Sequence, residues 1–176
     1  MTALEFVQLC YLRATGEAFT GTWGDGDASK IVALSNGKID SWAKEDDWNS
    51  LYDPGVNCGT ISATDSFDLD STIREVSNDP DDYVQIVRLD GKITNYQTVR
   101  ANDLKRYAEG NYCARVGTTL RFNRPFTATD PEYGGTLKVP AYLYPSYLSK
   151  ATDVVPVDDP NWLVAATAAD WVQNDV

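Results

Sequence analysis

The side chains that could carry out chemistry in this chain are almost all carboxylic acids. Its 176 residues include 26 Asp and Glu but no His, so mechanisms that use imidazole as a base, a proton relay or a metal ligand are excluded. The cysteines, Cys10, Cys58 and Cys113, stand far apart and form no CxxC pair, which argues against a zinc site and a dithiol redox site. We therefore predict that the protein is not an enzyme and has no catalytic residues, no cofactor and no bound transition metal.

Two acidic segments, 25–27 and 79–82, have the composition of cation ligands, because hard ions such as Ca²⁺ bind carboxylate oxygens. An EF-hand loop that began at Asp25 would place Asn36 where a Glu ligand is required. Asp beside Gly or Pro is also typical of turns. We interpret both segments as turns.

A pair of carboxylates beside aromatic rings is the composition of a glycosidase, and the sequence contains 5 Trp and 10 Tyr. No spacing singles out one pair of acids, and the sequence has no Gly-rich phosphate loop and no GxSxG elbow. Two alternatives stay open at this point. One is a small hydrolase with two carboxylates in a cleft, and the other is a β-rich carbohydrate-binding module of a virion or cell surface, which would bind glycans through Tyr and Trp.

The net charge of −11 is unevenly distributed along the sequence. Residues 1–73 carry 4 basic and 12 acidic side chains, residues 74–150 carry 11 and 9, and residues 151–176 carry 0 and 5. No cluster of Lys and Arg in the sequence could displace counterions from phosphates, so tight nucleic-acid binding is not expected. The acidic terminal regions are either a solvated surface, or a surface that repels DNA or meets a basic partner.

The first residues of the sequence carry signals for the start of a helix. Residues 3–15 are predicted to form a helix, because Thr2-Ala3-Leu4-Glu5 has the form of a capping box and Gly16 follows the last turn. A second helix is predicted over 27–47 from an apolar stripe at helical spacing. Its centre, Ser35-Asn36-Gly37, consists of poor helix formers, so we expect the helix to be kinked or unusually exposed there.

Between residues 52 and 148 the pattern changes to short runs of β-branched and aromatic residues with a period of two, as in strands. Tyr83 to Leu89 and Lys92 to Tyr96 are predicted to form a hairpin, with Asp90-Gly91 in a type I′ turn. Further strands are predicted at 112–116, 118–123 and 136–144, and one or two helical turns at 101–108.

A last helix is predicted over 160–174, with Asp159 as its N-cap and Pro160 at its first position. Its small residues would let a neighbouring backbone approach closely. The end of this helix has no Gly cap and no Lys or Arg, which suggests either a missing tail or a tail that a partner orders.

The two tryptophans of this helix, Trp162 and Trp171, are nine residues apart, so the helix directs them to opposite sides. If Trp162 anchors the core, Trp171 faces outward. We therefore predict that the outer face of the helix contacts another protein chain through Trp171, Val172 and Val176.

Together these signals predict an α+β fold. Its N- and C-terminal helices, residues 1–50 and 150–176, would form a small helical layer, and residues 51–149 an inserted antiparallel β module, in a single compact domain. The sequence has no apolar run near about eighteen residues and no signal peptide, and its cysteine count is odd. We therefore predict a chain with no membrane span that is made in a reducing cytosol.

The segments Leu4–Cys10, Lys30–Trp48, Leu120–Pro125, Leu137–Tyr142 and Val155–Val164 occur in this order, the last leading into the Ala-rich helix. Together they resemble the head-to-tail adaptor (connector) proteins of tailed phages, the family that includes podophage tail tubular A-like adaptors. Members of that family usually continue past the helix that starts at Asp159-Pro160 with a tail that docks on the portal, whereas this sequence stops at Val176.

The resemblance implies a non-enzymatic structural protein, made in the host cytoplasm and located in the virion neck between capsid and tail. Such proteins form a homo-oligomeric ring of about a dozen copies, a dodecamer. The ring binds the portal protein on one side and a tail or nozzle protein on the other, while DNA passes through the lumen without specific binding. The acidic terminal regions would then border the lumen and repel DNA. The outer face of the C-terminal helix would contact the portal or a neighbouring subunit.

Overall fold

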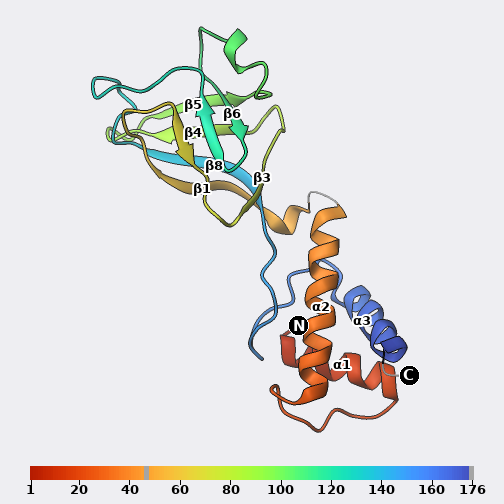
Figure 1. Ribbon diagram of the computed structural model, residues 1–176. Helices are drawn as coiled ribbons and strands as arrows, with labels where there is room; N and C mark the ends of the chain where they lie inside the picture. Colours follow the sequence, from red (N-terminus) through yellow and green to blue (C-terminus); the bar gives the residue numbers. More distant parts are fainter. Residues whose placement is uncertain (46–47, 175–176) are drawn as a thin grey trace. The chain divides into compact units, whose positions relative to one another are not determined.

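The computed structural model describes residues 1–45 and 48–174, and its contacts divide the chain into two compact units (Figure 1). The helical unit combines Met1–Ser50 with Pro145–Val176, and the sheet unit is Leu51–Tyr144. The described residues form three α-helices, two short 3₁₀ helices and eight strands, so the fold is α+β as predicted. The second crossing between units falls at residue 145, earlier than the expected 150.

Helix α1, Ala3–Thr15, begins with the predicted capping box. The Glu5 N–H donates to Thr2 Oγ1 (3.3 Å), and the Thr2 N–H donates to Glu5 Oε2 (2.7 Å). The first two amides of the helix are also satisfied, because the Ala3 N–H donates to the Asp153 carbonyl (2.7 Å) and the Leu4 N–H to the Ala151 carbonyl (3.1 Å). The beginning of α1 is therefore held both locally and by a distant part of the sequence.

Helix α2, Gly26–Glu45, is one uninterrupted helix. The expectation of unusual exposure at its centre is wrong for Ser35, which is fully buried and donates its hydroxyl to the Val32 carbonyl (2.9 Å). The Asn36 amide bonds the backbone of Leu148 in both directions, at 3.1 and 2.8 Å. These contacts explain why poor helix formers stand here. The predicted end at residue 47 lies outside the described residues.

Helix α3, Pro160–Asn174, starts where it was predicted. Asp159 Oδ1 accepts hydrogen bonds from the backbone N–H groups of Asn161 (3.0 Å) and Trp162 (3.3 Å). The helix packs on both α1 and α2, and an ion pair of 2.7 Å joins Asp170 to Lys38 of α2. The three helices therefore share one core.

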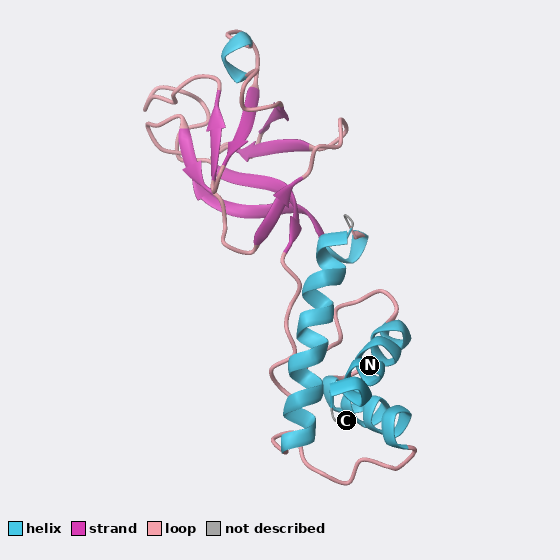
Figure 2. Ribbon diagram, turned by 45° about the vertical axis from the view of Figure 1, so that its right-hand side comes forward, coloured by secondary structure: helices cyan, strands magenta, loops and turns pink. Residues whose placement is uncertain are grey.

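The sheet unit is one strongly curled sheet (Figure 2). Its strands are β1 (Tyr52–Thr60), β2 (Ser66–Asp68), β3 (Ile73–Val76), β4 (Tyr83–Val87), β5 (Ile93–Thr98), β6 (Tyr112–Val116), β7 (Thr119–Phe122) and β8 (Thr136–Leu143). Their order is β1-β8-β4-β5-β6-β7-β2, and β3 also pairs with β8. The 3₁₀ helices are η1 (Asn49–Leu51) and η2 (Leu104–Arg106).

The prediction of a wholly antiparallel module is wrong, because β5 and β6 pair in parallel, with Gln97 opposite Tyr112 and Thr98 opposite Cys113. The connection between these strands contains η2 and returns the chain in its original direction. The other strand pairs are antiparallel. The sheet is therefore mixed.

The predicted hairpin is present as β4 and β5, with Val87 opposite Ile93. Its turn is not of type I′, which needs a positive φ at both central residues. Among the described residues, only glycines have a positive φ. In this turn Gly91 has one (φ 80°) and Asp90 does not. The Gly91 N–H donates to the Arg88 carbonyl (3.0 Å), and the Arg88 N–H donates to the Lys92 carbonyl (2.9 Å). These bonds indicate the longer loop in which a glycine bulge follows a turn.

Four aromatic rings fill the core of the curled sheet: Phe67, Tyr96, Phe122 and Phe126. The rings of Tyr96 and Phe122 meet edge to face, with centroids 4.8 Å apart, and those of Phe122 and Phe126 are 5.0 Å apart. Each such pair adds about 0.5–1.5 kcal/mol beyond the area that it buries. This cluster fixes the loop that follows β7, because Phe126 comes from it.

Candidate interaction surfaces

The tryptophans of α3 point to opposite sides of the helix, but in the reverse of the expected sense. Trp171 is 6% exposed, and its ring centroid lies 5.3 Å from that of Tyr11 of α1. Trp162 is 41% exposed. The reason is that Leu163, Thr167 and Trp171 form one buried stripe at intervals of four residues, and Trp162 lies outside it.

The outer face of α3 is consequently built around Trp162 and Val172, which is 46% exposed. Alanines 165, 166 and 169 lie between them and are exposed or half-buried. Of the three predicted contact residues, Val172 is on this face, Trp171 is in the core, and Val176 lies outside the described residues. We call this surface the α3 face. The sequence analysis did not identify Trp162 as a contact residue. The spacing of Leu163, Thr167 and Trp171 could have shown that Trp162 lies outside the buried side of the helix.

A second apolar surface lies on the outer side of α1. Its buried side is made by Phe6, Val7 and Cys10, whereas Leu9 and Leu12 are exposed. These leucines border a groove of about 540 Å³. The residues lining this α1 groove are Met1, Glu5, Gln8, Leu9, Leu12, Ala18 and Phe19. The sequence predicted the helix but not the groove, because the fold of residues 16–25 decides which leucines stay uncovered.

The sheet unit carries a polar cleft, formed by two adjoining hollows of about 540 and 170 Å³. Both hollows share Asn78, Thr98, Val99 and Arg100. The larger is completed by Asp103 and Tyr107, and the smaller by Glu75, Val76, Ala101 and Arg115. Nothing in the spacing of these residues marked them as neighbours, because they come from β3 and the segment after it, from the end of β5 and the segment after it, and from β6.

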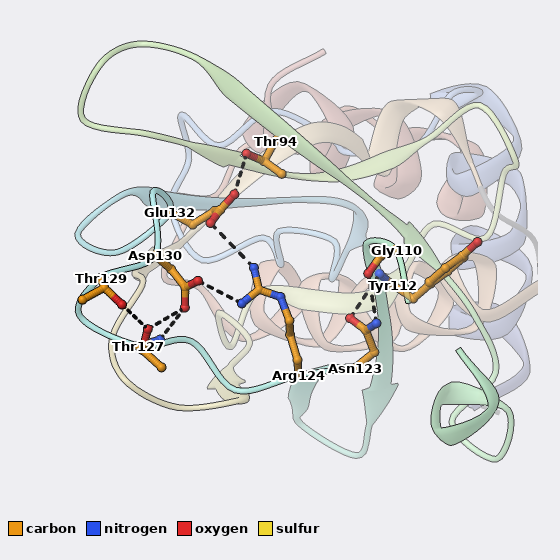
Figure 3. A network of polar contacts seen from close by, with 9 residues as sticks. All are labelled: Thr94, Gly110, Tyr112, Asn123, Arg124, Thr127, Thr129, Asp130 and Glu132. Carbon is orange, nitrogen blue, oxygen red and sulfur yellow. Dashed lines mark hydrogen bonds and ion pairs between the residues drawn. The ribbon is translucent and has the colours of Figure 1, made fainter. Parts of the chain in front are cut away.

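A second polar cluster of the sheet unit is organised by Arg124 (Figure 3). Its Nη1 lies 3.1 Å from Asp130 Oδ1, and its Nη2 lies 3.9 Å from Glu132 Oε2. Thr94 donates its hydroxyl to Glu132 Oε1 (3.0 Å). The guanidinium also lies 5.6 Å from the ring centre of Phe126. Arg124 thus joins the loop after β7 to β5 and to the aromatic core.

This cluster bears on the hydrolase alternative, because it brings two acids together. A general acid needs a raised pKa. The pKa of Asp130 is instead held below its usual value by hydrogen bonds from the backbone and hydroxyl of Thr127 and by Arg124. Burial and the charge of Glu132 raise the pKa of Tyr96 to about 12, so this phenol stays neutral. The arrangement has the character of a structural ion-pair network.

The acidic segments considered as cation ligands form turns. Asp25 Oδ2 accepts from the Thr22 N–H (2.5 Å), and Asp79 Oδ1 accepts from the Asp81 N–H (2.9 Å). Asp82 accepts from the Tyr52 hydroxyl (2.7 Å). Across residues 1–45 and 48–174, no group of three or more Cys, Asp or Glu side chains is placed to hold a metal ion.

The thiols of Cys10 and Cys113 are buried, and burial raises the pKa of each to about 12. Both therefore stay protonated and unreactive at neutral pH. Among the helices of the described chain, none is long and apolar enough to cross a membrane.

Comparison with known proteins does not assign a family or a function to this chain. A scan against protein-family models finds no matching family, and a search of curated proteins finds no match. The functional argument therefore depends on the surfaces described above.

Proposed function

We propose that this chain is a structural virion protein, a head-to-tail adaptor without enzymatic activity. Copies of it form a homo-oligomeric ring in the virion neck, a dodecamer by the family resemblance, which joins the portal protein to a tail or nozzle protein and surrounds the DNA channel. In this proposal the helices are the layer that carries assembly contacts, and the strands are a module inserted between them.

The observation that supports this proposal best is the presence of two different apolar surfaces on the helical unit. The α1 groove exposes Leu9 and Leu12, and the α3 face exposes Trp162 and Val172. Contiguous exposed apolar surface usually marks an interaction site. A cyclic ring needs contacts in which one patch meets a different patch on the next copy, and a connector also needs a surface for its neighbour in the tail. Two unlike surfaces on one unit fit the contact between neighbouring copies of the ring.

Trp162 is the residue that we expect to contribute most to assembly. Tryptophan is enriched among the few residues that dominate binding free energies, and the flanking alanines leave room for a partner's backbone. The expected role of Trp171 moves to Trp162 because Trp171 is committed to the contact with Tyr11. We therefore still propose that the outer face of α3 contacts a partner, now through Trp162 and Val172.

Electron microscopy of the purified chain, alone and mixed with its portal protein, tests the proposal. Wild-type protein should form rings that add to the portal. Trp162→Ala should reduce ring or portal association by roughly tenfold or more, with an unchanged circular dichroism spectrum. Tyr144→Ala is the matched control, because this ring is also exposed but belongs to the sheet unit. A wild-type chain that stays monomeric with its portal would contradict the proposal.

The carbohydrate-binding module remains the second candidate because of one feature of the polar cleft. Tyr107 lines it, is partly exposed, and has its ring centroid 4.4 Å from that of Tyr112. A close pair of rings, tilted by 32° to each other, lies beside polar side chains and suits a sugar face. Glycan-array binding that Tyr107→Ala abolishes, by a chain that is monomeric or trimeric, would favour this function over the adaptor.

A further inference from the structure

The polar cleft contains a guanidinium that is fixed in place but has no carboxylate partner among the described residues. Arg115 Nε donates to the Gly117 carbonyl (2.9 Å), and its Nη1 donates to the Arg74 carbonyl (2.7 Å). Both acceptors are neutral, so they orient the side chain without neutralising its charge. The donors on Nη2 are left for another group. A guanidinium held in this way is preorganised for a carboxylate or phosphate.

A second arginine lines the same cleft. Arg100 is exposed, and within residues 1–45 and 48–174 its guanidinium has neither a hydrogen bond nor an ion pair. The acids of the cleft do not cancel this charge. Asp103 is paired with Arg106 Nη1 at 3.0 Å, and Glu75 is the one remaining carboxylate in the lining. Arg100 and Arg115 together thus leave an excess of positive charge.

This positive cleft belongs to a strongly acidic chain, and most of the acid is in the helical unit. Residues 1–50 and 145–176 carry 5 basic and 13 acidic side chains, which gives −8 of the total −11. Residues 51–144 carry 10 basic and 13 acidic side chains, which gives −3. Electrostatic complementarity of this kind favours contact between unlike patches and fixes their register.

We propose that the polar cleft binds carboxylates on the helical unit of a second copy of this chain. In the ring, the cleft of one copy would contact the helical unit of the next copy. The inference therefore rests on the proposed adaptor function. Duplex DNA fits the cleft less well, because two arginines neutralise few phosphates and the net charge of the chain repels the polyanion. Nucleic acid is therefore an outcome of the test and not the proposed occupant.

Charge reversal tests the cleft. Arg100→Glu should raise the dissociation constant for self-association by about tenfold or more in sedimentation velocity. Its circular dichroism should be unchanged, because within the described residues the guanidinium makes no hydrogen bond and no ion pair. Lys92→Glu changes the same charge in the β4–β5 turn and should leave assembly unchanged. Raising the salt concentration should weaken wild-type assembly more than assembly of Arg100→Glu.

A cross-linking experiment identifies the occupant. Arg100→Lys keeps the charge and supplies an amine that a zero-length carbodiimide reagent joins to a carboxylate in direct contact. In a mixture of isotopically light and heavy chains, the amine at position 100 should be joined to Asp or Glu of the helical unit in mixed light–heavy pairs. Cross-links confined to one chain, cross-links to acids of the sheet unit, or no cross-link in assembled protein would each overturn the inference.

The outcomes also separate this inference from the proposed function. If wild-type protein assembles and Arg100→Glu behaves like Lys92→Glu, the inference fails and the adaptor proposal stands. If wild-type protein does not associate at any concentration, alone or with its portal, both fail. If Arg100→Glu assembles normally but loses binding to duplex DNA, the occupant is nucleic acid and the inference is wrong.

Discussion

At the scale of single residues, the two tryptophans of α3 have opposite roles that can be measured separately. Trp171→Ala should lower the free energy of unfolding by about 3–5 kcal/mol, because it opens a cavity beside Tyr11. Trp171→Phe should cost less, since the buried indole N–H has no hydrogen-bond partner in the described chain. Trp162→Ala should change stability by less than about 1 kcal/mol. Urea denaturation followed by circular dichroism measures all three, and equal losses for the two alanine variants would contradict the assignment.

Asp130 should make stability depend on pH in the acidic range. Its pKa is lowered below the ordinary 3.8, first by the Thr127 N–H at 2.6 Å and its hydroxyl at 3.0 Å, then by Arg124. Because the folded pKa is lower than the unfolded one, the stabilisation is present above 3.8 and is lost as the pH falls through the folded pKa. Thermal unfolding of wild type and Asp130→Asn at several pH values tests this. The difference between them should shrink on acidification, and a constant difference would refute the role.

At the scale of elements, the beginnings of α1 and α3 could be predicted from the sequence because capping signals are local. The capping box of α1 and the Asp159 cap of α3 act over three residues and are confirmed. Strand β1 was not predicted, because Asp53, Pro54 and Gly55 are typical of turns. The structure accommodates them in an end strand whose pairing with β8 shifts register after Asp53, where a missing N–H is tolerated.

The candidate surfaces could be predicted less well than the elements. The position of Arg115 beside Arg100 follows from parallel pairing of β5 and β6, and the sequence favoured an antiparallel arrangement. The α1 groove depends on the course of the loop after Gly16. Such features arise from tertiary packing, which periodicity does not encode.

Asn36 illustrates an element whose local propensity is outweighed by packing. Asn36→Ala should raise helix propensity but remove both bonds to the Leu148 backbone, leaving a partly buried N–H and C=O unsatisfied. We expect a net loss of about 1–3 kcal/mol in the free energy of unfolding. Gln8→Ala, on the exposed side of α1, is the control and should be close to neutral. A stabilised Asn36→Ala variant in thermal denaturation would show that propensity dominates.

At the scale of the whole molecule, the net charge of −11 should keep the protein from binding DNA tightly. In the proposed ring, acidic residues of the terminal regions border the channel, and repulsion focused in a narrow channel exceeds that of a flat surface. Fluorescence anisotropy with a labelled duplex at about 150 mM salt should show no submicromolar binding. Tight binding under these conditions would count against an acidic channel wall.

The amides that begin α1 donate to carbonyls of Asp153 and Ala151, and this has a consequence for biosynthesis. A ribosome releases residues 3 and 4 long before it has made their acceptors. Strand β1 likewise cannot pair until β8, its partner in the sheet, has been translated. Neither unit can therefore complete its native contacts before the later segment that closes it has been translated, and the apolar sides of α1 and α2 lack α3 until Pro160–Asn174 has left the ribosome. Nascent chains of this protein should depend on chaperone holding more than chains whose domains close in sequence order.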